Sequence, residues 1–209
     1  MSKYDPEHRI GLIVDEWGTW FDVEPGTNPG YLYQQNTMRD AMVAALTLNI
    51  FNRHCDRVIM ANLAQTVNVL QSVLLTDGKE VVLTPTYHVF DLYKNHQDAR
   101  EIDCLVETET IGRGEWWLPQ LSASASEKNG VTTVTIANLS ADQPADILLE
   151  GIKNGRTTGR ILQGAMQQYN DFDHQPLCIK PYKDMMNSES GINVVLPACC
   201  VVSIEVAQE

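Results

Sequence analysis

The chain has little of what defines several protein classes. It holds five cysteines among 209 residues, and the neighbours Cys199 and Cys200 are poorly placed to form a disulfide with each other. An odd, scattered set of this kind forms no disulfide framework, which favours a reducing compartment and a cytoplasmic protein. No segment approaches the ~18 apolar residues of a membrane helix, and no secretory signal peptide is evident. We therefore expect no membrane partner.

Basic residues are also scarce. The sequence has 15 Lys and Arg against 27 Asp and Glu, for a net charge of −12. Nucleic-acid binding draws on clustered Lys and Arg, so a nucleic-acid partner is not expected. His54 and Cys55 are adjacent, but no second pair of ligands stands at the spacing of a metal site. The sequence therefore predicts neither a metal nor a cofactor.

The most informative segment is residues 10–18. An apolar run ends in Asp15, Glu16, Trp17 and a glycine. A run that is polar on neither face predicts a strand buried on both sides of a parallel sheet. A carboxylate at the C-terminal end of such a strand stands where α/β barrels keep their chemistry, which makes Glu16 the first catalytic candidate. The alternative is that these acidic residues close the strand simply because the chain emerges into water.

The segments that follow predict two strand–helix units. Asn28 and Pro29 are typical of a helix N-cap followed by a first-turn proline, and the helix should stop near His54. Residues 58–63 then form a second buried strand, parallel to the first. Thr84 and the proline after it predict the start of a last helix that ends near residue 96. The first helix has apolar and small residues at a spacing of three and four, which predicts one buried stripe: Met38, Ala41, Met42, Ala45, Leu46 and Asn49.

The pattern changes near residue 99. Short alternating runs separated by turn residues such as Asn129 and Gly130 predict an antiparallel β-sandwich over residues 99–209. The predicted strands lie within residues 121–126, 131–137, 145–149, 160–163, 194–196 and 201–206.

Several of these segments, in this order, form a recognisable set. The motifs are Asp15-Glu16-Trp17-Gly18, residues 22–41, 49–54, 60–71 and 83–90, with looser matches at 169–173 and 196–198. Together they closely resemble the C-terminal part of the α-L-arabinofuranosidases of glycoside hydrolase family 51.

The resemblance implies a fold and an activity. The fold is the last strand–helix units of a (β/α)8 barrel, residues 1–98 with strands 7 and 8, followed by the β-sandwich. The activity is that of a retaining exo-glycosidase that releases terminal non-reducing α-L-arabinofuranosyl residues from arabinan- and arabinoxylan-type saccharides. Glu16 corresponds to the family's nucleophile, and Gln65 to a glutamine that faces the arabinose.

The sequence departs from the family in one respect. The family's acid/base glutamate lies in an Asn-Glu pair, which this sequence does not contain. We therefore expect the chain to be inactive alone and to need the upstream barrel segment of the same enzyme as its partner. The partners expected are this segment, an arabinose-containing saccharide and, by analogy with the family, further copies in a homo-oligomer.

Gln65 and two more residues, Asn62 and Trp20, are candidates for substrate binding, and each has an alternative, purely structural role. The amides of Gln65 and Asn62 suit a neutral polyol, but Asn62 could cap a turn and Gln65 could be solvated. Trp20 could line the entrance of the barrel and contact the sugar through its indole face, or it could pack in the barrel core. Trp17 is expected to have the packing role. Trp116 and its neighbour Trp117 could form a carbohydrate platform, but a strand-start pair is expected to anchor the preceding domain.

Two other functional classes stay open. The chain could act as a non-catalytic β-sandwich accessory or carbohydrate-interaction module, with residues 1–98 only partly organised. Two strands without their barrel neighbours would leave free edges and bare apolar surface. It could also belong to a relative that acts on another furanoside or on a pyranoside.

Overall fold

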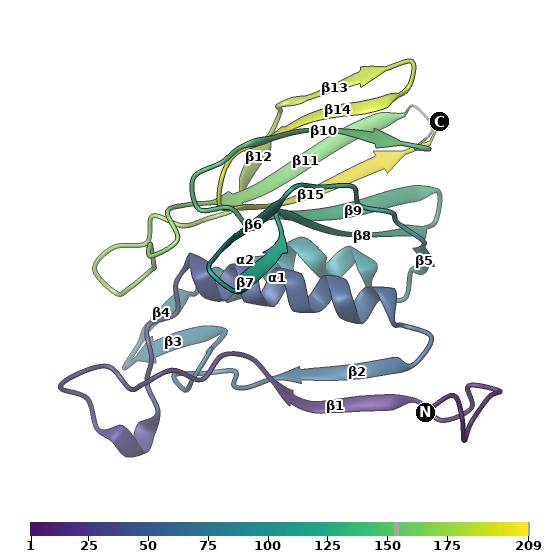
Figure 1. Ribbon diagram of the computed structural model, residues 1–209. Helices are drawn as coiled ribbons and strands as arrows, with labels where there is room; N and C mark the ends of the chain where they lie inside the picture. Colours follow the sequence, from purple (N-terminus) through teal and green to yellow (C-terminus); the bar gives the residue numbers. More distant parts are fainter. Residues whose placement is uncertain (153–154, 209) are drawn as a thin grey trace.

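The structure is a computed structural model that describes residues 1–152 and 155–208. Its elements are stacked in layers (Figure 1): a small sheet, a larger sheet, two helices and, beyond the helices, a pair of strands. No helix in the described ranges is both long and apolar enough to cross a membrane.

The first unit is a parallel strand pair with a helix between its strands. Strands β1 (Leu12–Trp17) and β2 (Val58–Leu63) pair in parallel, and α1 (Met38–Arg53) connects them. This confirms the predicted strand–helix–strand order and the helix end next to His54. The prediction that both strands are buried is wrong, since Ile13 is 47% and Ile59 66% exposed. The described residues cover one face of the pair with helices and leave the other face open.

The start of α1 also differs from the prediction. Asn28 and Pro29 do act as cap and first-turn proline, but only for the 3-10 turn η1 (Pro29–Tyr31). The chain leaves this turn through Leu32, whose φ of 52° lies in the left-handed region. The α-helix begins at Met38 with Thr37 as its N-cap. The predicted stripe is buried, except that Leu46 is only partly so.

A hairpin and a second helix follow β2. Strands β3 (Leu74–Asp77) and β4 (Glu80–Leu83) are antiparallel, and α2 (Pro85–Tyr93) follows them. The Thr84 hydroxyl accepts a hydrogen bond from the Tyr87 N–H, as expected of an N-cap. The 3-10 turn η2 (Lys94–His96) ends this part of the chain where the sequence predicted.

The rest of the described chain forms two antiparallel sheets. All six predicted runs lie in strands, and Asn129 and Gly130 turn the chain between two of them with φ of 54° and 79°. The larger sheet has the order β12 (Lys180–Tyr182), β11 (Arg156–Gln163), β15 (Cys200–Ala207), β9 (Val131–Asn138), β8 (Leu121–Lys128), β5 (Arg100–Ile102). The smaller has the order β10 (Ala145–Glu150), β14 (Gly191–Leu196), β13 (Met185–Ser188).

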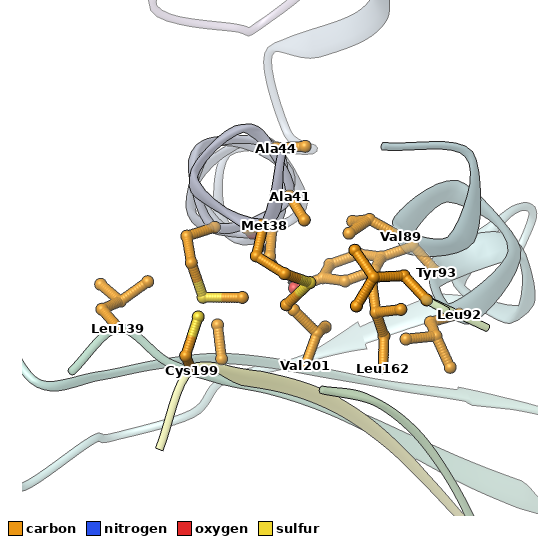
Figure 2. Close-up of a cluster of buried hydrophobic side chains, with 14 residues drawn as sticks. Met38, Ala41, Ala44, Val89, Leu92, Tyr93, Leu139, Leu162, Cys199 and Val201 are labelled. Carbon is orange, nitrogen blue, oxygen red and sulfur yellow. Dashed lines mark hydrogen bonds between the residues drawn. The ribbon is translucent and has the colours of Figure 1, made fainter. Parts of the chain in front are cut away.

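Two apolar cores hold the layers together. One lies between the sheets and contains Ile136, Ile192 and Ile204. The other lies between the larger sheet and the helices, where Leu162 and Val201 of the sheet meet side chains of α1 and α2 (Figure 2). The helices of the first 98 residues therefore share a core with the sandwich and are packed firmly against it.

A separate hairpin carries the tryptophan pair. Strands β6 (Thr110–Arg113) and β7 (Trp116–Pro119) are antiparallel to each other and belong to neither large sheet. Trp116 is 81% and Trp117 62% exposed. Both indoles are therefore largely uncovered by the described residues, and the expectation that the pair anchors the preceding domain stays a prediction. Ile111 of β6 makes the hairpin's contact with the helix core.

Candidate active site

The candidate site lies at the C-terminal ends of β1 and β2. Val14 pairs with Ala61 and Trp17 with Leu63, so Asp15 and Glu16 together stand opposite the single residue Asn62. Such a bulge kinks a strand and redirects its side chains. Glu16 and Asn62 are both exposed. The bulge in the strand pairing thus lies at Glu16 and Asn62, two of the candidate site residues.

Trp17 shows which face of β1 is covered. Its indole packs edge-on against Phe51 of α1 and stacks on Phe90 of α2, with ring centroids 5.6 Å and 6.1 Å apart. This is the structural role expected for Trp17. By contrast, Glu16, which lies in the bulge, is exposed to solvent.

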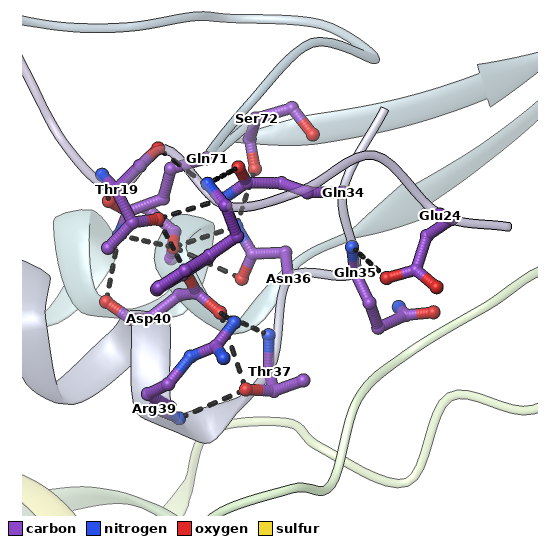
Figure 3. Close-up of polar contacts among 12 residues, drawn as sticks. Thr19, Glu24, Gln34, Gln35, Asn36, Thr37, Arg39, Asp40, Gln71 and Ser72 are labelled. Atoms are coloured by element: carbon purple, nitrogen blue, oxygen red, sulfur yellow. Dashed lines mark hydrogen bonds and ion pairs between the residues drawn. The ribbon is translucent and has the colours of Figure 1, made fainter. Parts of the chain in front are cut away.

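A buried polar cluster fixes the loop that follows β1 (Figure 3). The Thr19 hydroxyl donates to the Asp40 carboxylate at 2.7 Å, and the Thr19 N–H donates to the Gln71 side-chain carbonyl at 2.8 Å. The Gln34 amide donates to the Thr19 hydroxyl at 2.9 Å and accepts from the Phe21 N–H at 2.8 Å. Asp40, Gln34 and Gln71 are at most 2% exposed. The backbone on both sides of Trp20 is therefore held to α1 and to the segment after β2.

The cluster continues toward α2. The Gln71 amide donates to the Asp40 backbone carbonyl at 2.8 Å and to the Thr86 hydroxyl at 3.2 Å. Asn36 donates to that hydroxyl and to the Ser72 carbonyl, both at 3.0 Å. Amide groups that donate and accept can satisfy several buried partners at once, which suits them to such a connection.

Sequence reasoning missed this cluster. The available signal was the spacing of Thr37 and Asp40, which form a capping box: the Asp40 carboxylate accepts from the Thr37 N–H at 2.8 Å. Asp40 also forms an ion pair with the Arg39 guanidinium at 3.3 Å. That guanidinium lies 3.7 Å from the centroid of the Phe21 ring. No pattern in the sequence pointed to Gln34 or Gln71.

The remaining candidates are Trp20 and Gln65. Trp20 is 66% exposed at the end of the anchored loop, so its indole face is accessible. Gln65 follows β2 and is also exposed; in the described part of the chain its side chain makes no hydrogen bond, whereas its backbone carbonyl accepts from Val73. All four predicted site residues thus lie at or just after the C-terminal ends of the strand pair, and among residues 1–152 and 155–208 their side chains make no hydrogen bond or ion pair.

A groove of about 720 Å³ begins at Gln65. Its walls come from residues 27–33, residues 65–77 and Phe172, and they include neither Glu16, Trp20 nor Asn62. Within the described residues, no three His, Cys, Asp or Glu side chains gather in a way that could hold a metal ion. The chemistry available at this edge is therefore that of the Asp15 and Glu16 carboxylates, two amides and an indole.

Comparisons with known proteins give a consistent result. The family described as α-L-arabinofuranosidase C-terminal domain matches residues 15–200. An intracellular exo-α-L-arabinofuranosidase of Bacteroides ovatus is 45% identical over 98% of this chain, and α-L-arabinofuranosidase C of Emericella nidulans is 30% identical over 70% of it. These alignments cover 41% and 31% of the two relatives.

Solved structures agree. The crystal structure of the GH51 arabinofuranosidase from Xanthomonas axonopodis pv. citri superposes with a TM-score of 0.93 and 43% identity. The superposition covers 99% of this chain and 43% of that one. The chain thus spans about two fifths of the length of such proteins and matches their C-terminal portion.

Proposed function

The chain belongs to the family 51 α-L-arabinofuranosidases, and from this membership we propose that it is the C-terminal part of a retaining exo-α-L-arabinofuranosidase. The enzyme would release terminal non-reducing α-L-arabinofuranosyl residues from arabinan- and arabinoxylan-type saccharides. The observation that carries the proposal is Glu16, exposed in a strand bulge at the C-terminal end of β1.

Glu16 is suited to the nucleophile's role. A retaining glycosidase needs an ionised carboxylate that attacks the anomeric carbon and a second, protonated carboxyl about 5–5.5 Å away that protonates the leaving oxygen. Glu16 is exposed and can be reached by a sugar, and the anchored loop that follows it limits how far the site can shift. In this account Gln65 and Asn62 bind sugar hydroxyls and Trp20 packs against the sugar's apolar C–H groups.

The proposal assigns residues 1–98 to the end of a (β/α)8 barrel and residues 99–209 to the sandwich. The parallel pair β1 and β2, covered by helices on one face only, supports the first assignment. Its open face would meet the upstream barrel segment, which would also bring the acid/base glutamate. The chain alone would then be inactive. Assembly into a homo-oligomer and a cytoplasmic location complete the proposal; the Bacteroides ovatus relative is named an intracellular enzyme.

The test is hydrolysis of an aryl α-L-arabinofuranoside by two proteins. One is this chain alone, and the other is a hybrid that joins the upstream part of the Bacteroides ovatus relative to this chain. We expect turnover by the hybrid, none by the chain, and loss of turnover in the hybrid carrying Glu16→Gln. Asp15→Asn is the matched control. Full activity of Glu16→Gln would contradict the proposal.

A second candidate function has one observation in its favour. The exposed indoles of Trp116 and Trp117 stand on a hairpin outside both sheets, as a carbohydrate-interaction module would present them. Saccharide binding by this chain that disappears in Trp116→Ala and survives Glu16→Gln would favour that function.

A further inference from the structure

The groove next to Gln65 has a wall that comes from the sandwich. The chain between β11 and β12, residues 164–179, leaves the larger sheet and crosses the start of α1. Its carbonyls at Gln168 and Met166 accept hydrogen bonds from the Met38 and Arg39 N–H groups at 2.9 Å and 3.0 Å. This segment brings Phe172, 39% exposed, to the groove.

Buried contacts hold that segment in place. Asn170 is 1% exposed; its amide donates to the carbonyls of Leu83 and Leu177 at 2.9 Å and 2.8 Å, and its side-chain carbonyl accepts from the Leu177 N–H at 2.9 Å. Leu177 is itself part of the core between helices and sheet. Phe172 therefore stands on a segment that is fixed on both sides.

The opposite wall is equally well defined. Leu32 places the chain in a left-handed turn, and the carbonyl of Leu32 accepts from the Leu70 N–H at 2.9 Å. Tyr33 pairs with Leu70 as an isolated parallel bridge, which ties this wall to the segment after β2. Tyr31 is 70% exposed beside it.

The lining has the chemistry of a saccharide site. Three rings, Tyr31, Tyr33 and Phe172, line the groove together with Gln65. In the described part of the chain, the two tyrosine hydroxyls and the Gln65 amide make no hydrogen bonds, so they are free to bind sugar hydroxyls. Asn68 is different, since its side chain is used by Thr76: it donates to the Thr76 carbonyl at 3.1 Å and accepts from the Thr76 N–H at 2.8 Å.

The charges of the groove lining favour a neutral ligand over an anionic one. The lining includes one acidic residue, Asp77, and no Lys, Arg or His. Nearby acidic groups and burial raise the pKa of Tyr33, with burial the larger cause, so its hydroxyl stays a neutral donor. An anionic ligand would find no counter-charge, whereas a neutral polyol finds aromatic faces and free hydrogen-bonding groups. A volume of about 720 Å³ is large for a single pentose.

We propose that this groove binds the leaving-group part of the substrate, the neutral saccharide units beyond the terminal arabinose, with Phe172 and Tyr31 as its aromatic contacts. The inference rests on the proposed function, because it takes Gln65 as the boundary with the terminal-sugar site. It makes the segment between β11 and β12 a determinant of saccharide preference, although that segment belongs to the sandwich.

Calorimetric titration of this chain with α-1,5-linked arabinotriose tests the binding step. We expect Phe172→Ala and Tyr31→Ala each to weaken binding about five- to tenfold, which is the scale of one aromatic contact. Trp116→Ala, an exposed aromatic away from the groove, is the matched control and should bind as the parent does. Unchanged binding by both groove variants, or loss in Trp116→Ala instead, would overturn the proposal. Thermal unfolding midpoints equal to the parent's would show that the variants are folded.

The hybrid enzyme separates this inference from the proposed function. We expect Phe172→Ala to lower kcat/KM for arabinotriose about five- to tenfold and to leave kcat/KM for α-L-arabinofuranosyl fluoride, whose leaving group is too small to reach the groove, unaffected. An equal loss on both substrates would overturn the groove's role as a leaving-group site. A hybrid inactive on both would count against the proposed function, and the calorimetric result would then decide the groove by itself.

Discussion

Glu16 and Trp17 are neighbours in the chain with opposite environments. The indole packs between Phe51 and Phe90, while the carboxylate is exposed to solvent. The end of β1 thus does two things: Trp17 packs the strand on the helices, and the bulge before it leaves Glu16 exposed. The site depends on packing as much as on its polar groups.

His96 gives a prediction about acid. Its ring nitrogens lie 2.8 Å from the Ser126 hydroxyl and 2.9 Å from the Thr135 hydroxyl, and burial lowers its pKa from 6.5 to about 4. Between those pH values the unfolded chain binds more protons than the folded one, so acidification lowers the free energy of unfolding. The loss should reach up to about 3 kcal/mol by pH 4.

Chemical denaturation from pH 7 to pH 4 checks this. His96→Gln should flatten the pH dependence relative to the parent, because the variant has no imidazole to charge at that place. His174→Gln is the control, since His174 is exposed. The account fails if His96→Gln and the parent lose stability in parallel through that window.

Among the elements, β8 explains how helix and sheet come together. Its sequence alternates serine and alanine: Ser122 and Ser124 face the helices and bond Asn49, whereas Ala123 and Ala125 face the core between the sheets. Small side chains on both faces let the layers approach closely. The buried hydroxyls of Ser122, Ser124 and Ser126 on β8 each have a partner, which avoids the penalty of an unpaired polar group.

Thr37 gives a prediction for α1. Its hydroxyl accepts from the Arg39 N–H at 3.2 Å, and its own N–H donates to Asp40. Thr37→Ala removes the side-chain half of the capping box and should lower the free energy of unfolding by about 1 kcal/mol. Thr37→Ser keeps the hydroxyl and should lie within a few tenths of the parent. Urea titrations of the three proteins decide; equal losses in both variants would mean that the cap contributes nothing.

Local sequence signals predicted most helices and strands. They failed where contacts between residues far apart in the sequence determine the structure. Thr84 marked a helix start correctly because the cap and its helix are adjacent in sequence. Asn28 carried the same signal, but the left-handed turn at Leu32 ends that helix after one turn. The contacts made by Gln34 and Gln71 with Thr19 cross 15 and 52 positions, and neither periodicity nor motif encodes such pairings. The candidate site residues came from a motif set; Phe172 lies in one of its looser matches, but nothing in the sequence places that segment beside residues 27–33.

At the scale of the whole molecule, β1 and β2 expose apolar side chains and unpaired strand edges to water. Ile59 is 66% and Met60 53% exposed, and both strand edges are unpaired in the described structure. Bare apolar surface with free edges favours association. We expect this chain to form concentration-dependent oligomers in sedimentation velocity, and Ile59→Lys to shift them toward monomer.

Val81→Lys is the control for that experiment. Val81 is 54% exposed on β4, away from the strand pair, so its replacement should leave the oligomers unchanged. Oligomers that persist in Ile59→Lys and dissolve in Val81→Lys would place the associating surface elsewhere.

The shared core predicts how the chain unfolds. Leu92 and Met38 of the helices pack with Leu162 and Val201 of the sheet, so helices and sandwich should resist protease together. Limited proteolysis should cut first within residues 18–33 and the first ten residues, and spare residues 38–93. Removal of residues 1–98 as a unit, leaving residues 99–209 intact, would instead support an independent sandwich module.

The central claim is that Glu16 is the nucleophile, and a covalent adduct tests it most directly. The hybrid enzyme would be treated with an activated 2-fluoro arabinofuranoside, whose good leaving group needs no acid, and peptides would be mapped by mass spectrometry. The account predicts one sugar per chain, bound to Glu16 and absent in Glu16→Gln. An adduct on Asp15 or on another carboxylate, or an unchanged adduct in Glu16→Gln, would contradict it.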